Sequence, residues 1–174
     1  MKRVASFILL LVFFICNGND SLVAQVRKER QKGKEKKIVR EQAVDLLLKE
    51  QQVAAERAAL KELYWVLGGE DWRTKENWLS DRPVEEWYGV ERNYDNGKLS
   101  IYLGSNGLKG VLPGSIFMLK TLEVLNLCNN QITGSIPTAV GECTALRQLS
   151  LNGNHLTGEI PVGIGKLENL MMLD

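Results

Sequence analysis

The sequence contains very few of the residues from which metal sites and catalytic centres are built. Among 174 residues there are three cysteines and a single histidine, His155. A catalytic histidine needs a positioned partner, and the residues around His155 offer none. A zinc site needs more nitrogen or sulfur ligands than these, and no glycine-rich stretch has the spacing of a phosphate-binding loop. We therefore expect no enzyme activity, no metal and no cofactor.

So few cysteines also exclude a dense disulfide framework. Cys16 lies in an apolar N-terminal segment, which leaves Cys128 and Cys143 for the rest of the chain. The sequence predicts one exposed thiol, at Cys128, and one buried thiol, at Cys143.

The apolar run of residues 4–16 is shorter than the roughly 20 residues that a membrane-spanning helix needs. It follows Lys2 and Arg3 and is ended by polar residues, which is the pattern of an export signal. We predict a signal peptide within residues 1–24, with its cleavage position open. The protein is then expected to be secreted or at the cell surface.

A basic tract downstream leaves alternatives open. Residues 27–40 carry eight Lys or Arg against two Glu, whereas residues 41–174 carry 12 Lys or Arg against 18 Asp or Glu. Because positive charge prefers the cytoplasmic side, the apolar run could stay as a membrane anchor; it could also be a chance apolar start. Membrane association is expected only with such an anchor or with a transmembrane helix beyond residue 174. No aromatic residues interleave the tract for base stacking, so we expect no nucleic-acid partner.

Residues 25–55 are charged and free of proline, and they predict a stalk that is a lone exposed helix or partly disordered. Apolar residues recur here every seven positions, at Val39, Leu46, Val53 and Leu60. A stable coiled coil needs both seams of the heptad. The second seam is mostly polar, at Gln42, Lys49, Glu56 and Leu63. An oligomerising coiled coil remains the alternative.

A period of 24 residues fills residues 98–174. It relates Asn106, Asn130 and Asn154; Gly110, Gly134 and Gly158; and Pro113, Pro137 and Pro161. In each unit two leucines alternate, as Leu125 and Leu127 do, which predicts a short strand with both side chains inward. Such units bury their apolar edge only against their neighbours, so they stack into a solenoid of about three repeats with the next one truncated.

The asparagine that follows each predicted strand has a structural role. An inward amide supplies both a donor and an acceptor to the backbone of neighbouring turns. We predict that Asn106, Asn130 and Asn154 form a ladder of this kind.

We predict that residues 56–97 form an N-terminal cap. A helix is expected from Glu56 to Leu67, with its apolar residues on one face and Gly68-Gly69 as its stop. Trp72, Trp78 and Trp87 follow. Their aromatic density suits a segment that covers the open core of the first repeat.

Two segments carry a resemblance to a known family. Residues 130–137 read NQITGSIP and residues 154–161 read NHLTGEIP, close to the consensus of plant-type leucine-rich-repeat ectodomains. Residues 56–173 thus resemble those of receptor-like kinases, receptor-like proteins and secreted inhibitors. The resemblance implies an α/β solenoid: a short right-handed superhelix of 24-residue leucine-rich repeats, with a parallel sheet on the concave face and a helical, tryptophan-rich cap.

The cap stretch from Leu60 to Val90 looks like the caps of such proteins in algae, other protists and some bacteria. Caps of the land-plant type hold a cysteine pair around the element that reads Trp87-Tyr88-Gly89-Val90 here. This chain has Glu86 and Arg92 in that region and no cysteine. The difference weakens a land-plant receptor assignment.

The outward residues of the predicted strands form the candidate binding site. They are Ser100, Val124 and Gln148; Tyr102, Asn126 and Ser150; and Gly104, Cys128 and Asn152. The concave face of a curved solenoid is its natural contact surface. We therefore predict a module that binds a protein or peptide. The alternatives are the N-terminal part of a receptor-like kinase whose catalytic domain lies beyond residue 174, and a truncated gene model; as given, the chain is expected to fray after about Leu167.

Overall fold

The computed structural model describes residues 33–174, so the predicted signal segment lies outside the described residues. Helix α3 (Gly33–Val66) runs through the boundary between two compact units, residues 1–54 and 55–174. In the first unit, Lys49 and Asp45 form an exposed ion pair at 3.3 Å, one helical turn apart. No helix among the described residues is long and apolar enough to cross a membrane.

The second unit begins with the last turns of α3, in which Leu60, Leu63 and Tyr64 are buried, and Leu67 directly after the helix is buried with them. Gly68, two residues after the end of α3, has a φ of 67°, the left-handed conformation that glycine adopts without strain. The short 3₁₀ helices η2 (Gly69–Asp71) and η3 (Val84–Glu86) follow.

The three tryptophans after α3 join the core of the repeats. Trp72, Trp78 and Trp87 are buried in one apolar cluster with Leu60 and Leu63 of α3 and with Leu99 and Ile101 of the first repeat. The indole of Trp72 donates to the Leu67 carbonyl and that of Trp78 to the Tyr88 carbonyl, each at 2.9 Å. Trp72 thus ties its loop to the end of the helix, and Trp78 links two of the loops that follow.

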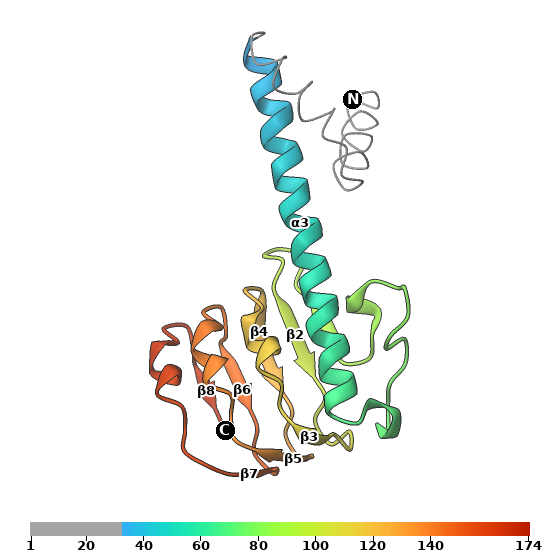
Figure 1. The fold of residues 1–174 in the computed structure, drawn as a ribbon, viewed down its shortest axis with the longest axis vertical. Helices are drawn as coiled ribbons and strands as arrows, with labels where there is room; N and C mark the ends of the chain where they lie inside the picture. The colour runs from blue at the N-terminus through green and yellow to red at the C-terminus, as the bar shows by residue number, and fades with distance from the viewer. Residues whose placement is uncertain (1–32) are drawn as a thin grey trace. The chain divides into compact units, whose positions relative to one another are not determined.

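One face of the repeats is a five-stranded sheet (Figure 1). Its strands, in spatial order, are β1 (Val90–Arg92), β2 (Leu99–Tyr102), β4 (Leu122–Asn126), β6 (Gln148–Ser150) and β8 (Met172–Leu173). The strands from β2 to β8 are parallel, and the register aligns Ile101 with Leu125, Leu149 and Leu173, each 24 residues further on. The parallel sheet was predicted, whereas the antiparallel edge strand β1 was not.

A second sheet lies across the repeats from the first. It is parallel and consists of β3 (Lys109–Val111), β5 (Gln131–Gly134) and β7 (His155–Leu156). The 3₁₀ helices η4 (Gly114–Met118), η5 (Thr138–Glu142) and η6 (Val162–Lys166) come next in each repeat, directly after Pro113, Pro137 and Pro161. Gly110 and Gly134 therefore lie in strands, and each recurring proline directly precedes a helical turn.

Candidate functional site

Alternate residues of the five-stranded sheet point away from the core, and we call this side of the sheet the open face. Ser100, Val124 and Gln148 form one row across its strands. Tyr102, Asn126 and Ser150 form a second row. Between the rows, Ile101, Leu125 and Leu149 are completely buried on the opposite side. The sheet thus brings residues 24 positions apart into direct contact.

A third row, formed by Gly104, Cys128 and Asn152, lies just beyond the ends of the strands. The Ser105 amide donates to the Cys128 carbonyl at 2.9 Å, and the Asn129 amide donates to the Asn152 carbonyl at 2.8 Å, so successive turns are stacked. Gly104 and Asn152 are exposed. Cys128 is only half-buried, less exposed than predicted, because its thiol lies against the turn of Gly104, where an added Cβ would be 3.0 Å from the sulfur.

Ser150 differs most from its predicted role as a contact residue, because only 4% of it is exposed. Its hydroxyl accepts a hydrogen bond from Gln148 Nε2 at 3.1 Å and donates to Asp174 Oδ2 at 3.5 Å. The two longer side chains bond to the short serine between them and cover it. In the third repeat Gln148 is therefore more accessible than Ser150.

The remaining polar side chains of the open face use only part of their hydrogen-bonding capacity internally. Asn126 is half-buried, and its Oδ1 accepts from the Cys128 amide at 3.2 Å, a bond that does not use its Nδ2 donors. Gln148 uses Nε2 for Ser150 and keeps Oε1 as an acceptor. Tyr102 is 39% exposed. In residues 33–174 these three side-chain groups have no other polar partner.

Asn130 links two repeats behind the open face. Its Oδ1 accepts from the backbone amides of Asn106 and Leu108, both at 3.0 Å. Its Nδ2 donates to the carbonyls of Leu103 and Leu127, both at 2.9 Å. One side chain thus satisfies backbone groups in its own repeat and in the preceding one.

Asn154 occupies the equivalent position one repeat later. It accepts from the Ile132 amide at 3.0 Å and donates to the carbonyls of Leu127 and Leu151. Asn106, at the start of the series, bonds instead to the backbone of Thr74 in the loop after α3. The series holds the strands of the open face in fixed register.

Positive and negative charges are not balanced on the strands of the open face. Its five strands contain no lysine, and their one arginine, Arg92, faces the core side and bonds to Glu56. Arg147, just before β6, pairs with Glu123 at 3.4 Å. Glu91 of β1 is exposed on the open face and has no ion-pair partner in the described part of the chain. The unpaired charge on the strands themselves is therefore negative.

Glu56 and Arg92 belong to a buried polar cluster that the sequence did not reveal. Arg92 Nη2 and the Thr121 hydroxyl each donate to Glu56 at 2.6 Å, and Arg92 Nε lies 3.6 Å from Glu85. Burial lowers the pKa of Arg92, but the hydrogen bond and negative charge of Glu56 outweigh it and raise that pKa. Glu56 had been assigned to a polar heptad seam; only the fold brings it to Arg92 and Thr121.

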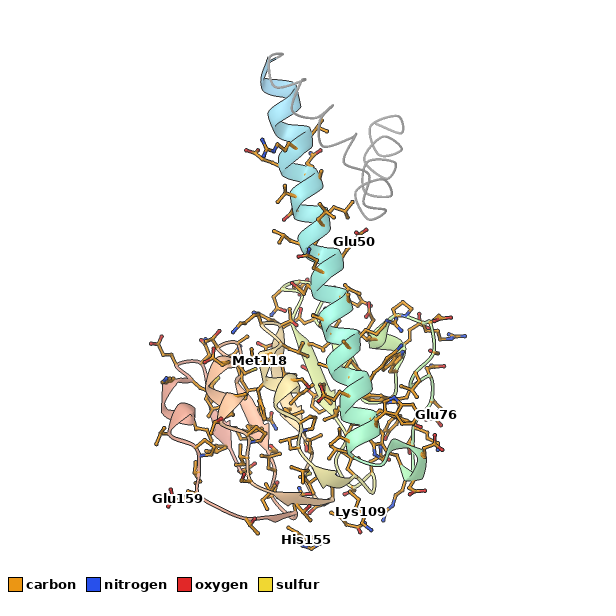
Figure 2. All side chains as sticks on the ribbon, viewed as in Figure 1. Glu50, Glu76, Lys109, Met118, His155 and Glu159 are labelled. Atoms are coloured by element: carbon orange, nitrogen blue, oxygen red, sulfur yellow. The ribbon has the colours of Figure 1, made fainter. Side chains whose placement is uncertain are left out.

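The other chemically active side chains lie away from the open face. His155 projects from β7 at the edge of the molecule (Figure 2) and is exposed. Cys143 is a free, buried thiol, and burial raises its pKa to about 11. Among residues 33–174 no cluster of three His, Cys, Asp or Glu could hold a metal ion.

Residues 100–156, which include three of the parallel strands and their asparagines, match the family of leucine-rich repeats. The matched residues make up about a third of the chain. Over 62 residues it is 40% identical to a probable leucine-rich repeat receptor-like protein kinase of Arabidopsis thaliana. That stretch is 34% of this chain and 7% of the relative.

Solved structures of plant receptors share the leucine-rich-repeat fold. One is the Arabidopsis receptor kinase HAESA in complex with the peptide hormone IDA and the co-receptor SERK1, with a TM-score of 0.61, 29% identity, and coverage of 68% of this chain and 20% of that one. Another is the ectodomain of the Arabidopsis thaliana receptor kinase GASSHO1/SCHENGEN3 in complex with Casparian strip integrity factor 2, with a TM-score of 0.60, 30% identity and coverage of 66% and 14%. This chain therefore spans a fifth or less of these relatives.

Proposed function

We propose that the open face binds an extended segment of a protein or peptide. The observation that carries the proposal is the pair of outward polar groups on adjacent strands, the Nδ2 donors of Asn126 and the Oε1 acceptor of Gln148. Asn126 lies opposite Ser150 and Gln148 lies opposite Val124, so the two groups are diagonal neighbours, about 7–8 Å apart. That separation is close to the length of two residues of extended chain, at about 3.4 Å per residue, so the donor and the acceptor can meet a carbonyl and an amide two residues apart on an extended main chain.

The architecture supports this use of the face. We propose that the 24-residue repeats coil as a short right-handed superhelix, with the open face concave and with residues 56–97 as the N-terminal cap. The inward asparagines hold the strands in register, so a ligand meets a preformed surface and little ordering is needed on binding. In this proposal the module recognises its partner and performs no chemistry.

We also propose that the protein acts outside the cell or at its surface. The support is its likeness to receptor ectodomains that were solved with a peptide hormone or a protein factor. A direct test is to express the full chain with its N-terminal segment and to determine the N-terminal residue and the location of the mature protein. Mature protein in the cytosol with Met1 retained would contradict export.

Selection from a random dodecapeptide library on the immobilised protein tests the binding proposal. The full chain is expected to enrich a family of related peptides. A variant with Asn126→Glu and Gln148→Glu is expected to lose them, because two charged side chains replace the neutral groups that would meet the peptide backbone.

The matched control carries the same number of new charges on the second sheet, as Gln131→Glu and His155→Glu. Both residues are exposed on β5 and β7, so this control should retain the peptides. Equal loss in both double variants, or equal retention in both, would contradict binding at the open face.

A second candidate function is that of the N-terminal part of a receptor-like kinase. The favouring observation is the 40% identity to a receptor-like kinase of which the matched stretch is only 7%. Sequencing the transcript past the codon for Asp174 tests this directly. A kinase domain in the same reading frame would establish it, and a stop codon would exclude it.

A further inference from the structure

We propose that the N-terminal end of the open face holds a cationic side chain, Lys or Arg, of the bound segment between Glu91 and Tyr102. This inference rests on the proposed function, because it concerns the same face. It adds a chemical class of ligand that the rows of neutral residues alone do not specify.

The strand pairing places Glu91 and Tyr102 together. In the antiparallel pair of β1 and β2, Glu91 is opposite Ser100 and Val90 is opposite Ile101. Directly opposite residues share a face, so Glu91 points outward with Ser100 and Tyr102, while Val90 is buried with Ile101. Glu91 and Tyr102 are diagonal neighbours, and such positions are about 7–8 Å apart, close enough for one cation to contact both.

Gly89, the residue before β1, places no side chain beside the Tyr102 ring. The Tyr102 amide donates to the Gly89 carbonyl at 2.6 Å, so Gly89 faces Tyr102 across the strands. Gly89 has a φ of 74°, and a Cβ at this residue would overlap the Tyr102 carbonyl oxygen. Only glycine fits there. Tyr102 and the exposed Glu91 therefore lie on the open face with no β1 side chain next to the ring.

The charges around Glu91 and Tyr102 decide which ligand group binds between them. Arg92 and Arg147 are neutralised by Glu56 and Glu123, at 2.6 and 3.4 Å. Glu91 keeps an unpaired negative charge within the described residues. A cation over the ring gains from its π-electrons and from the carboxylate together. A carboxylate or phosphate of a ligand would instead be repelled.

The peptides enriched from the random dodecapeptide library provide the test. They are expected to share a Lys or Arg at one fixed position. In calorimetry with the wild-type chain, changing that Arg to citrulline, or that Lys to norleucine, should weaken binding about tenfold. With Glu91→Gln the same change in the peptide should weaken binding less than threefold, and with Tyr102→Leu its effect should also shrink.

The matched control is Glu142→Gln, which removes an equal charge from an exposed residue of η5 outside the five-stranded sheet, and it should keep the tenfold effect. Enriched peptides without a shared basic residue would overturn this inference and leave the proposed function standing. So would an undiminished effect of the peptide change in Glu91→Gln. If no peptide is enriched at all, the proposed function itself fails, and this inference fails with it.

Discussion

Asn130 makes five hydrogen bonds to backbone groups of two repeats, whereas Asn126, four residues earlier, makes one to its own turn. Replacing Asn130 by alanine leaves buried amides and carbonyls without partners. We expect Asn130→Ala to lower the free energy of unfolding by about 1–3 kcal/mol. Asn126→Ala should lower it by less than about 0.5 kcal/mol. Urea denaturation of the two variants compares them, and equal losses would refute the different roles assigned to these asparagines.

We expect the buried thiol of Cys143 to make the folded protein less stable at alkaline pH. Burial raises the pKa of this thiol to about 11 from its ordinary value of 9.0. Between these values the folded protein keeps the thiol proton and the unfolded chain releases it. The contribution of this thiol to the free energy of unfolding is therefore complete below pH 9. It is lost as the pH rises to 11, by up to about 1.4 kcal/mol per pH unit. Urea denaturation from pH 8 to 11 should show a shallower decline for Cys143→Ala than for the wild type, and parallel curves would contradict the assignment.

At the residue scale the sequence located the ladder but missed the backbone conformations beside it. Ser105, Asn129 and Gly153 occupy one position of successive repeats, each with φ between 55° and 67°. Gly153 and, more weakly, Asn129 signal a left-handed residue, whereas serine seldom adopts that conformation. The burial of Ser150 was equally hidden, because it depends on hydrogen bonds from Gln148 and to Asp174.

At the scale of elements, the buried pair of Glu56 and Arg92 joins α3 to β1. Glu56 is almost fully buried, and removing its partner strands a charge in the core. Arg92→Ala should cost about 3–5 kcal/mol. The control is Arg82→Ala, which breaks an exposed pair with Glu86 and should cost less than about 1 kcal/mol. Thermal unfolding of both variants measures this, and similar midpoints would argue against the buried pair.

Elements with strong periodic patterns were predictable, and those made by pairing across the fold were not. Leu125 and Leu127 alternate in a way that identifies β4, and Gly68 marks the end of α3. Val90–Arg92 has too short a pattern to predict a strand and becomes one by pairing with β2. Strand β3 likewise contains Gly110, which reads as a turn residue, and exists through its pairing with β5. The predicted heptad seam placed Glu56 with polar residues, although the tertiary fold buries it.

At the scale of the whole molecule, burial falls off toward the last repeat. Ile101 and Leu125 are completely buried, whereas 94% of Val162 and 75% of Met171 are exposed. Segments with few buried contacts open locally at lower free energy. Hydrogen exchange on the full chain should therefore be fast after Leu167 and slow from Ile101 to Leu127. Uniform slow exchange through Leu173 in a monomer would contradict this gradient.

The central claim is that a peptide binds at the open face, and the reactivity of a cysteine on that face can report the binding. Cys128 lies half-buried in the third row of that face, and Cys143 is buried in the core. The measurement is the rate of iodoacetamide alkylation at each thiol, read by mass spectrometry with and without a saturating peptide from the library selection. A peptide bound on the open face should slow alkylation of Cys128 severalfold, while Cys143 stays unreactive in both samples. An unchanged rate at Cys128 with the peptide bound would place the binding site elsewhere and contradict the account.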